Sequence, residues 1–448
     1  MKSILGLIIF LSITAQAQVF IPFGFNRCIL PFNTGSDAAM LDFLLGTTSN
    51  TIVTGASVVL SATKASGDYT SRIFNVTGDC LANSNWYSVS WQGSLPYGKL
   101  LPDFRTTLQS ESTADYSGLS SSTFMSTMMG QWHMQETVIG TATGAKDFAD
   151  SSGNAKHGLI TGGVTLNQIG QIGRAVLFNG TSGYVDMGVP TNITGLGNWS
   201  VSFWINPTAL TANQQIILYR SDNDSQQGFF VTLTPTGQIK LQIVNATTDT
   251  QAITSNTLTV GAWSHILITT DSSLVSANSK IYINGIQAGY TGAVAGSGAH
   301  TSAVAQNLYV GKTGTTTGPA TNAFLKSMLE ELTFHGRILT AAEALELYRR
   351  GINRIRFQFR SCLLSDCSDL PIWKGPDGTS ATYFSEIYNN LTQLTWLSYV
   401  LPTSPEMIFG NFPASTISNN QYFQYKVRFE TDNVTYLPDI KLITIKRP

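Results

Sequence analysis

The feature that most constrains the fold is a period-two alternation of apolar and polar residues, which recurs between turn-forming residues. Because successive side chains of a β-strand point to opposite faces, each such segment can bury one face and expose the other. Many short strands at this spacing predict an all-β protein built from sandwiches or jelly rolls. The clearest strand segments are residues 199–205, 227–233, 238–243, 263–268 and 279–283.

Helical periodicity predicts one clear helix, at residues 340–350. Thr340 is a suitable N-cap, and Glu343 three residues later completes a capping box. Gly351 is expected to end this helix, because glycine is favoured just beyond a helix C-terminus. A further helical turn is predicted within residues 37–45.

The first residues predict export. Lys2 precedes an apolar run at residues 4–13, and residues 15–17 (Ala-Gln-Ala) fit the pattern that a signal peptidase recognises. The run is too short to span a bilayer, so we interpret residues 1–17 as a signal peptide. No later stretch is long and apolar enough to predict a transmembrane helix. We therefore expect a secreted or cell-surface protein.

The composition excludes some classes of partner. Charged residues make up 12% of the chain and the net charge is −1, which gives no reason to expect nucleic acid as a partner. A chain of 448 residues predicts two or three domains. Residues 105–129 are rich in Ser and Thr and poor in apolar residues, so we interpret them as a linker.

The four cysteines are predicted to form disulfides, because exported proteins meet an oxidising environment. They are Cys28, Cys80, Cys362 and Cys367, and their spacing fits no zinc template. Three pairings are possible. The short gap between Cys362 and Cys367 favours a local loop, which leaves Cys28 to pair with Cys80.

An ordered series of motifs runs from about residue 130 to residue 351. It comprises residues 131–136, 150–154, 173–180, 199–205, 263–265, 281–285, 308–311, 329–332 and 337–343. This series resembles the laminin-G-like, concanavalin A-type jelly roll of bacterial surface proteins. The resemblance implies a jelly-roll fold over residues 130–351, and its order along the chain carries more weight than any one motif.

The flanking segments resemble the front and back halves of one smaller β-sandwich module of bacterial exported proteins. The front half is residues 67–104 and the back half is residues 352–448. Neither half has enough strands to cover its own apolar face, so we expect the two to pair. The jelly roll is then inserted in a loop of this outer sandwich, and residues 18–66 form a separate N-terminal segment.

The resemblance to the jelly-roll family implies one calcium ion as a cofactor. Calcium binds six to eight oxygens. Asp150 and Asn154, in a glycine-containing loop, resemble one part of the ligand set, and Glu330 or Glu331 resembles the far carboxylate. Because side chains alternate along a strand, only one of these glutamates is expected to face the loop. In the alternative interpretation, Asp150 caps a turn and both glutamates are surface charges.

A glycan site needs an exposed aromatic platform beside hydrogen-bonding groups. Tyr184, Tyr219 and Tyr290 lie near predicted loops and are the candidate platform residues. Asp222 and Asp224, in an oxygen-rich loop between strands, are candidate ligand contacts, although such a loop is more often a solvated turn. Four tryptophans lie inside strand patterns and are predicted to be core residues: Trp132, Trp199, Trp204 and Trp263.

The sequence gives no catalytic residue. It has neither a Gly-x-Ser-x-Gly elbow nor a His-Glu-x-x-His motif, and the carboxylate alternation of jelly-roll glycosidases is missing. His133 and His157 have no partner motif. We predict a non-catalytic recognition protein or adhesin that binds glycan or glycoprotein through jelly-roll loops. The alternative is a structural subunit of a surface fibre or envelope assembly, forming homo-oligomers through strand edges and the aromatic start (Phe20, Phe23 and Phe25).

Overall fold

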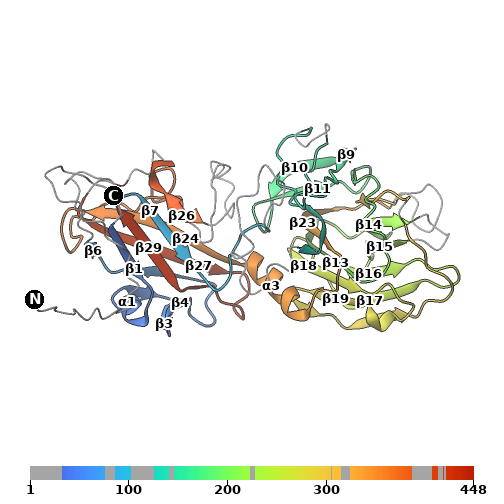
Figure 1. Ribbon diagram of the computed structural model, residues 1–448, viewed down its shortest axis with the longest axis horizontal. Coiled ribbons are helices and arrows are strands. Elements are labelled where there is room, and N and C mark those ends of the chain that lie inside the picture. The colour runs from blue at the N-terminus through green and yellow to red at the C-terminus, as the bar shows by residue number, and fades with distance from the viewer. Residues whose placement is uncertain are drawn as a thin grey trace, which may run out of the picture.

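The computed structural model describes residues 33–75, 86–101, 126–140, 146–221, 228–303, 305–313, 323–385, 406–411, 417 and 420–447. Over these residues the chain forms two β-domains joined at helix α3 (Ala341–Ile352), as Figure 1 shows. The predicted all-β class is confirmed. Cys28, Cys80, Asp222, Asp224, the predicted signal peptide and the three N-terminal phenylalanines lie outside the described residues.

The larger domain is a sandwich of two antiparallel sheets. We call the sheet beside α3 the proximal sheet; its order is β10-β11-β23-β13-β18-β19-β20, and β8 also pairs with β23. Its strands are β8 (Met128–Trp132), β10 (Val164–Ile169), β11 (Arg174–Phe178), β13 (Trp199–Pro207), β18 (Ser264–Thr270), β19 (Lys280–Ile283), β20 (Ile286–Gln287) and β23 (Ser327–His335).

The second sheet lies away from the smaller domain, and we call it the distal sheet (Figure 1). Its order is β21-β17-β16-β15-β14-β22-β12-β9. Its strands are β9 (Leu159–Thr161), β12 (Tyr184–Asp186), β14 (Gln215–Ser221), β15 (Gly228–Leu233), β16 (Gln238–Ile243), β17 (Thr250–Thr257), β21 (Tyr290–Val294) and β22 (Tyr309–Val310).

The core between the two sheets consists of the inward side chains that the alternation predicts. Trp132, Phe178, Trp199 and Phe334 are buried there, and the rings of Trp199 and Phe229 lie 4.5 Å apart between centroids. Burial of large aromatic and aliphatic side chains provides the main free energy for holding the sheets together.

The smaller domain is built from segments on both sides of the jelly roll in the chain. Its sheets have the orders β1-β29-β7-β26, β2-β5-β27-β24-β25 (with β6 on β27) and β28-β4-β3. The strands before the jelly roll are β1 (Asn33–Asp37), β2 (Thr47–Ser49), β3 (Thr51–Thr54), β4 (Ser57–Leu60), β5 (Ser66–Thr70), β6 (Phe74–Asn75) and β7 (Ser88–Gln92). Those after it are β24 (Asn353–Cys362), β25 (Phe384–Ser385), β26 (Glu406–Ile408), β27 (Tyr422–Thr431), β28 (Asp439–Ile440) and β29 (Leu442–Arg447).

The pairing of these strands crosses the whole insertion. β5 pairs with β27, and β7 lies between β29 and β26. Residues 33–66 also contribute strands to this domain, together with the short helix α1 (Met40–Leu44). The predicted local disulfide between Cys362 and Cys367 is confirmed, at the end of β24.

Helix α3 has the predicted start but a different end. The Thr340 hydroxyl accepts a hydrogen bond from the Glu343 amide, and the Glu343 carboxylate accepts one from the Thr340 amide, which confirms the capping box. The helix continues through Gly351 to Ile352, so the prediction that Gly351 ends it is wrong. Glycine is needed there for close packing, because a Cβ would lie 2.3 Å from the Trp204 ring.

Candidate functional site

The predicted calcium ligands in the loop after Phe148 hold the loop itself together. One oxygen of Asp150 accepts hydrogen bonds from the amides of Gln131 (3.1 Å) and Ser152 (2.9 Å) and from the Ser152 hydroxyl. The other oxygen accepts one from the Lys156 amide at 2.8 Å. The Asn154 amide group donates to backbone carbonyls of β8. Both side chains therefore fasten this loop to β8.

Glu330, on β23, is fully buried beneath the loop that precedes β11. Its Oε1 accepts hydrogen bonds from the amides of Gln171 and Ile172, each at 2.9 Å. Burial raises the pKa of Glu330 well above its usual range, the two amides oppose that shift, and the charge of Glu331 adds to it. A proton on this carboxyl is favoured because water cannot solvate the charge.

Both glutamates face the same side of the proximal sheet, which corrects the expectation that they point to opposite faces. β13 pairs through Trp204 with Glu330 and through Ser202 with Thr333, so β23 has one extra residue between these two pairs. Glu331 occupies this extra position, with a backbone φ of 49°. A bulge of this kind redirects a side chain and breaks simple alternation.

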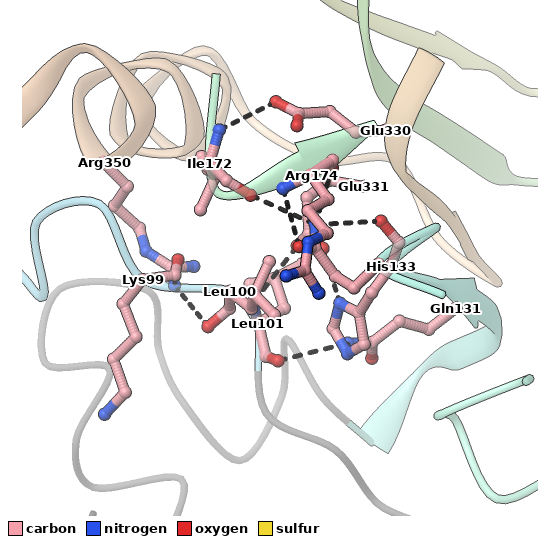
Figure 2. Close-up of polar contacts among 11 residues, drawn as sticks. Lys99, Leu100, Leu101, Gln131, His133, Ile172, Arg174, Glu330, Glu331 and Arg350 are labelled. Atoms are coloured by element: carbon pink, nitrogen blue, oxygen red, sulfur yellow. Dashed lines mark hydrogen bonds and ion pairs between the residues drawn. The ribbon is translucent and has the colours of Figure 1, made fainter. Parts of the chain in front are cut away.

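Glu331 is part of a buried polar network where the two domains meet, shown in Figure 2. Its carboxylate accepts a hydrogen bond from the Leu101 amide at 3.2 Å and lies 2.5 Å from Nδ1 of His133. Gln131 donates to the Leu101 carbonyl at 3.3 Å. The crossing segment 98–101, which we call the strap, is thus held to the jelly roll by side chains.

Arg350 of α3 holds the other part of the strap. Its guanidinium donates to the carbonyls of Lys99 (2.8 Å) and Leu100 (3.1 Å), and the Gly98 amide donates to the Arg350 carbonyl. Further along the junction, Gln171 and Arg354 both donate to the Asp432 carboxylate. The Gln171–Asp432 bond joins the two domains through their side chains, whereas the Arg354–Asp432 pair lies within the smaller domain and positions Asp432.

The predicted metal ligands do not form a calcium shell in this arrangement. The oxygens of Asp150 and Oε1 of Glu330 already accept N–H groups, and Glu331 serves the strap. The described part of the chain holds no group of three or more His, Cys, Asp or Glu side chains suited to a metal. Calcium stays a prediction, and no step below depends on it.

A serine–histidine pair also lies at this junction, in a small cavity that Glu331 helps to line. The Ser202 hydroxyl is 2.8 Å from Nε2 of His265. Burial lowers the pKa of His265 to about 3, and its Nδ1 has no hydrogen-bond partner among the described residues. A general base needs a pKa near the working pH and an orienting acid, so this pair lacks the properties of a catalytic dyad.

The outer face of the distal sheet carries a row of aromatic side chains, which we call the aromatic row. The row crosses four neighbouring strands. Tyr309 of β22 pairs with Asp186 on β12 on one side and with Tyr219 on β14 on the other. Tyr219 in turn pairs with Phe230 on β15. Tyr184, two residues before Asp186, lies on the same face. Tyr184 and Tyr309 meet edge to face with centroids 6.0 Å apart. Both are partly exposed.

Tyr219, a predicted platform residue, is a buried member of this row. Only 2% of its surface is exposed, and its ring stacks on Phe230 with centroids 5.9 Å apart. Tyr290, also predicted, uses its hydroxyl to accept a hydrogen bond from the Ile281 amide. The structure therefore leaves Tyr184 and Tyr309 as the tyrosines that present ring surface on this face.

The backbone on either side fixes these rings in place. The Asn179 side chain accepts hydrogen bonds from the amides of residues 181–183 and so shapes the turn that leads into Tyr184. Gly311 follows β22 with a φ of 93°, which favours glycine. Its amide donates to Ile217 and its carbonyl accepts from Leu325. Lys312 therefore leaves the sheet from a fixed backbone position.

Lys312 lies over both tyrosine rings. Its Nζ is 3.5 Å from the Tyr184 ring centroid and 4.5 Å from that of Tyr309, within range of a cation–π interaction. Beside it, the Asp186 carboxylate accepts hydrogen bonds from the Asn307 side chain and the Gly188 amide. Burial, and next the charge of Asp186, raise the pKa of Tyr309, so its phenol keeps its proton as a donor.

Comparison with known families agrees with this architecture. Residues 179–344 match a laminin G family model described as the concanavalin A-like lectin/glucanases superfamily. The jelly roll has the concanavalin A-like fold. A sequence comparison with curated proteins finds no match. No helix in the described part of the chain is long and apolar enough to cross a membrane.

Several solved structures resemble part of the chain. For the receptor binding domain of botulinum neurotoxin C/D mosaic serotype, the identity is 15%, the coverage is 50% of this chain and 51% of that one, and the TM-score is 0.38. Domain 4 of AbnA, an extracellular arabinanase of Geobacillus stearothermophilus, is 20% identical over 49% of this chain and 98% of that one, with a TM-score of 0.35. The binding domain of Paraclostridial Mosquitocidal Protein 1 is 16% identical over 54% of this chain and 62% of that one, with a TM-score of 0.39. The chain thus spans about half the length of the botulinum domain.

In the concanavalin A-like domain, sequence reasoning found Tyr184 but missed Tyr309 and Lys312. Tyr309 lies in a short strand of two residues, too short for alternation to show which face it occupies. Lys312 is 128 positions from Tyr184 in the chain, and only the pairing of β12 with β22 brings them together. The available signal was Gly311, since a glycine after a strand often marks a backbone turn.

Proposed function

We propose that this protein is an exported, non-catalytic recognition protein whose concanavalin A-like domain binds glycan on the outer face of the distal sheet. Tyr184 and Tyr309 form the platform, and polar side chains at its rim provide hydrogen bonds. The partner is a glycan or glycoprotein outside the cell.

The observation that carries the proposal is the partly exposed pair Tyr184 and Tyr309 beside Asp186, Asn307 and Lys312. Sugar rings present apolar C–H faces and polar edges, and a tyrosine offers both an apolar ring and a polar tip. Binding sites typically combine such apolar surface with a few fixed polar groups. The disulfide between Cys362 and Cys367 supports an oxidising, extracytoplasmic location.

Replacing Tyr184 with alanine is expected to weaken glycan binding about tenfold or more, because an aromatic anchor that contacts a ligand commonly contributes over 1.4 kcal/mol. The mature protein is first screened on a glycan array, and affinities for its best saccharide are then measured by titration calorimetry. Tyr422→Ala is the matched control, since it removes a partly exposed tyrosine from the smaller domain. Equal affinity for all three proteins would contradict the proposed site.

A second candidate function is assembly into a surface structure. It is favoured by an apolar patch on α1 and β3, where Leu41, Leu44, Leu45 and Ile52 are 76%, 53%, 63% and 49% exposed. Apolar side chains gathered on a surface often mark a contact with another protein. Light scattering would show oligomers of the wild type that Leu41→Asp disperses. A monomer at all concentrations, together with saccharide binding, would leave recognition as the function.

A further inference from the structure

The ammonium group of Lys312 has no negative partner within the residues that the structure describes. No described carboxylate pairs with it, and its neighbours are the faces of Tyr184 and Tyr309. The nearby Asp186 carboxylate is instead engaged by Asn307 and Gly188. An ammonium group has three N–H donors and accepts nothing, so a ligand group beside these rings that contacts Lys312 must be an acceptor.

This arrangement differs from that of the other basic side chains near the sites described. Arg350 and Arg220 are buried and donate to backbone carbonyls, so they serve the fold. Arg354 pairs with Asp432 at the domain junction. Lys312 alone among these four lies on the ring faces of the proposed glycan site.

We propose that Lys312 with the Tyr184 and Tyr309 rings forms a subsite for an acidic sugar residue, one with a carboxylate or sulfate group, within the glycan ligand. The inference rests on the proposed function and specifies its substrate class. The sugar ring lies against a tyrosine, and its anionic group accepts hydrogen bonds from the Lys312 ammonium. Such charge-assisted hydrogen bonds are shorter and stronger than neutral ones.

The rigid exit of the chain at Gly311 makes this placement specific. Gly311 is held on one side by the Ile217 carbonyl and on the other by the Leu325 amide. A Cβ at residue 311 would lie 2.7 Å from the Phe178 ring, so this backbone position requires glycine. Lys312 is therefore directed toward the rings by the fold as well as by its attraction to them.

The test is a glycan array in which each acidic saccharide, such as an oligogalacturonate, is printed beside its neutral counterpart, here the methyl-esterified oligomer. Four proteins are compared: the wild type, Lys312→Met, Lys312→Arg and Lys280→Met. Lys280→Met removes an equivalent charge from an exposed position on the proximal sheet. Thermal unfolding of each variant confirms that it is folded.

We expect the wild type to bind one or more acidic saccharides at least tenfold more tightly than their neutral counterparts, with a preference that falls as salt rises. Lys312→Met should lose this preference, and Lys312→Arg and Lys280→Met should retain it. If the wild type binds neutral and acidic saccharides with equal affinity, and Lys312→Met does the same, the acidic subsite is overturned. Glycan recognition would still stand in that case. A wild type that binds no saccharide at all would overturn both proposals.

Discussion

Replacing Arg350 with methionine is expected to lower the free energy of unfolding by about 3 kcal/mol, because it removes the hydrogen bonds from the guanidinium to the carbonyls of Lys99 and Leu100. Removing one partner of a hydrogen bond at a buried site costs about 1–3 kcal/mol. Methionine keeps much of the side-chain volume, so the effect reports hydrogen bonding more than packing. Equilibrium unfolding in urea, followed by tryptophan fluorescence, measures the change.

Arg349→Met is the matched control for this prediction. It removes the same charge from the neighbouring helical position, where the guanidinium lies 6.0 Å from the Tyr436 ring. We expect a loss of no more than about 1 kcal/mol, as for a weak cation–π contact. Hydrogen exchange localises the effect, since the Gly98 and Leu101 amides bond across the junction and should exchange faster only in Arg350→Met. Equal destabilisation by both variants would show that the strap does not depend on Arg350.

The strap fixes the position of the jelly roll relative to the smaller domain. Two side chains from different elements, Glu331 on β23 and Arg350 on α3, bind consecutive backbone groups of the same short segment. The continuous path from α3 into β24 forms the second connection between the domains. Two connections fastened by buried hydrogen bonds allow less relative motion than a single flexible linker would.

The strands were predictable because their signal is local. In β16, for example, Ile239, Leu241 and Ile243 point into the core, and this alternation is visible in six consecutive residues. The capping box of α3 is equally local, since Thr340 and Glu343 are three residues apart. The family motifs added the order of the strands, which periodicity alone cannot provide.

The predictions that failed depended on contacts between distant segments. Glu330 and Glu331 share a face because β13 pairs with β23 through a bulge, and nothing near residue 330 in the sequence signals that irregularity. Gly351 lies within the helix because the Trp204 ring occupies the space beside it, 147 positions earlier in the chain. In both cases tertiary packing prevailed over a local rule.

Replacing Glu330 with glutamine is expected to stabilise the protein at pH 8 and to leave its stability unchanged near pH 4. Burial raises the folded-state pKa of Glu330 above the value of about 4.3 that an unfolded chain would have. The folded state therefore holds this proton more tightly than the unfolded state does. Stability is full below the unfolded pKa and falls as the pH rises toward the folded pKa.

Glutamine carries no charge, and its Oε1 can still accept the amides of Gln171 and Ile172. The variant consequently avoids the cost of ionising a buried carboxyl, which is about 1.4 kcal/mol for each unit of pKa shift. The free energy of unfolding of both proteins is measured between pH 4 and pH 9 in EDTA. The two curves should meet at the acidic end and separate steadily as the pH rises.

Glu331→Gln provides the matched control, with the opposite sign. Its carboxylate accepts the strap amide of Leu101 and contacts His133, so the loss of charge there weakens bonds that the fold uses, by about 1 kcal/mol. Repeating the series with calcium in place of EDTA tests the predicted cofactor as well. If calcium stabilises the wild type but not Glu330→Gln, the charged Glu330 carboxylate binds the ion. The explanation of Glu330 by burial alone would then be wrong.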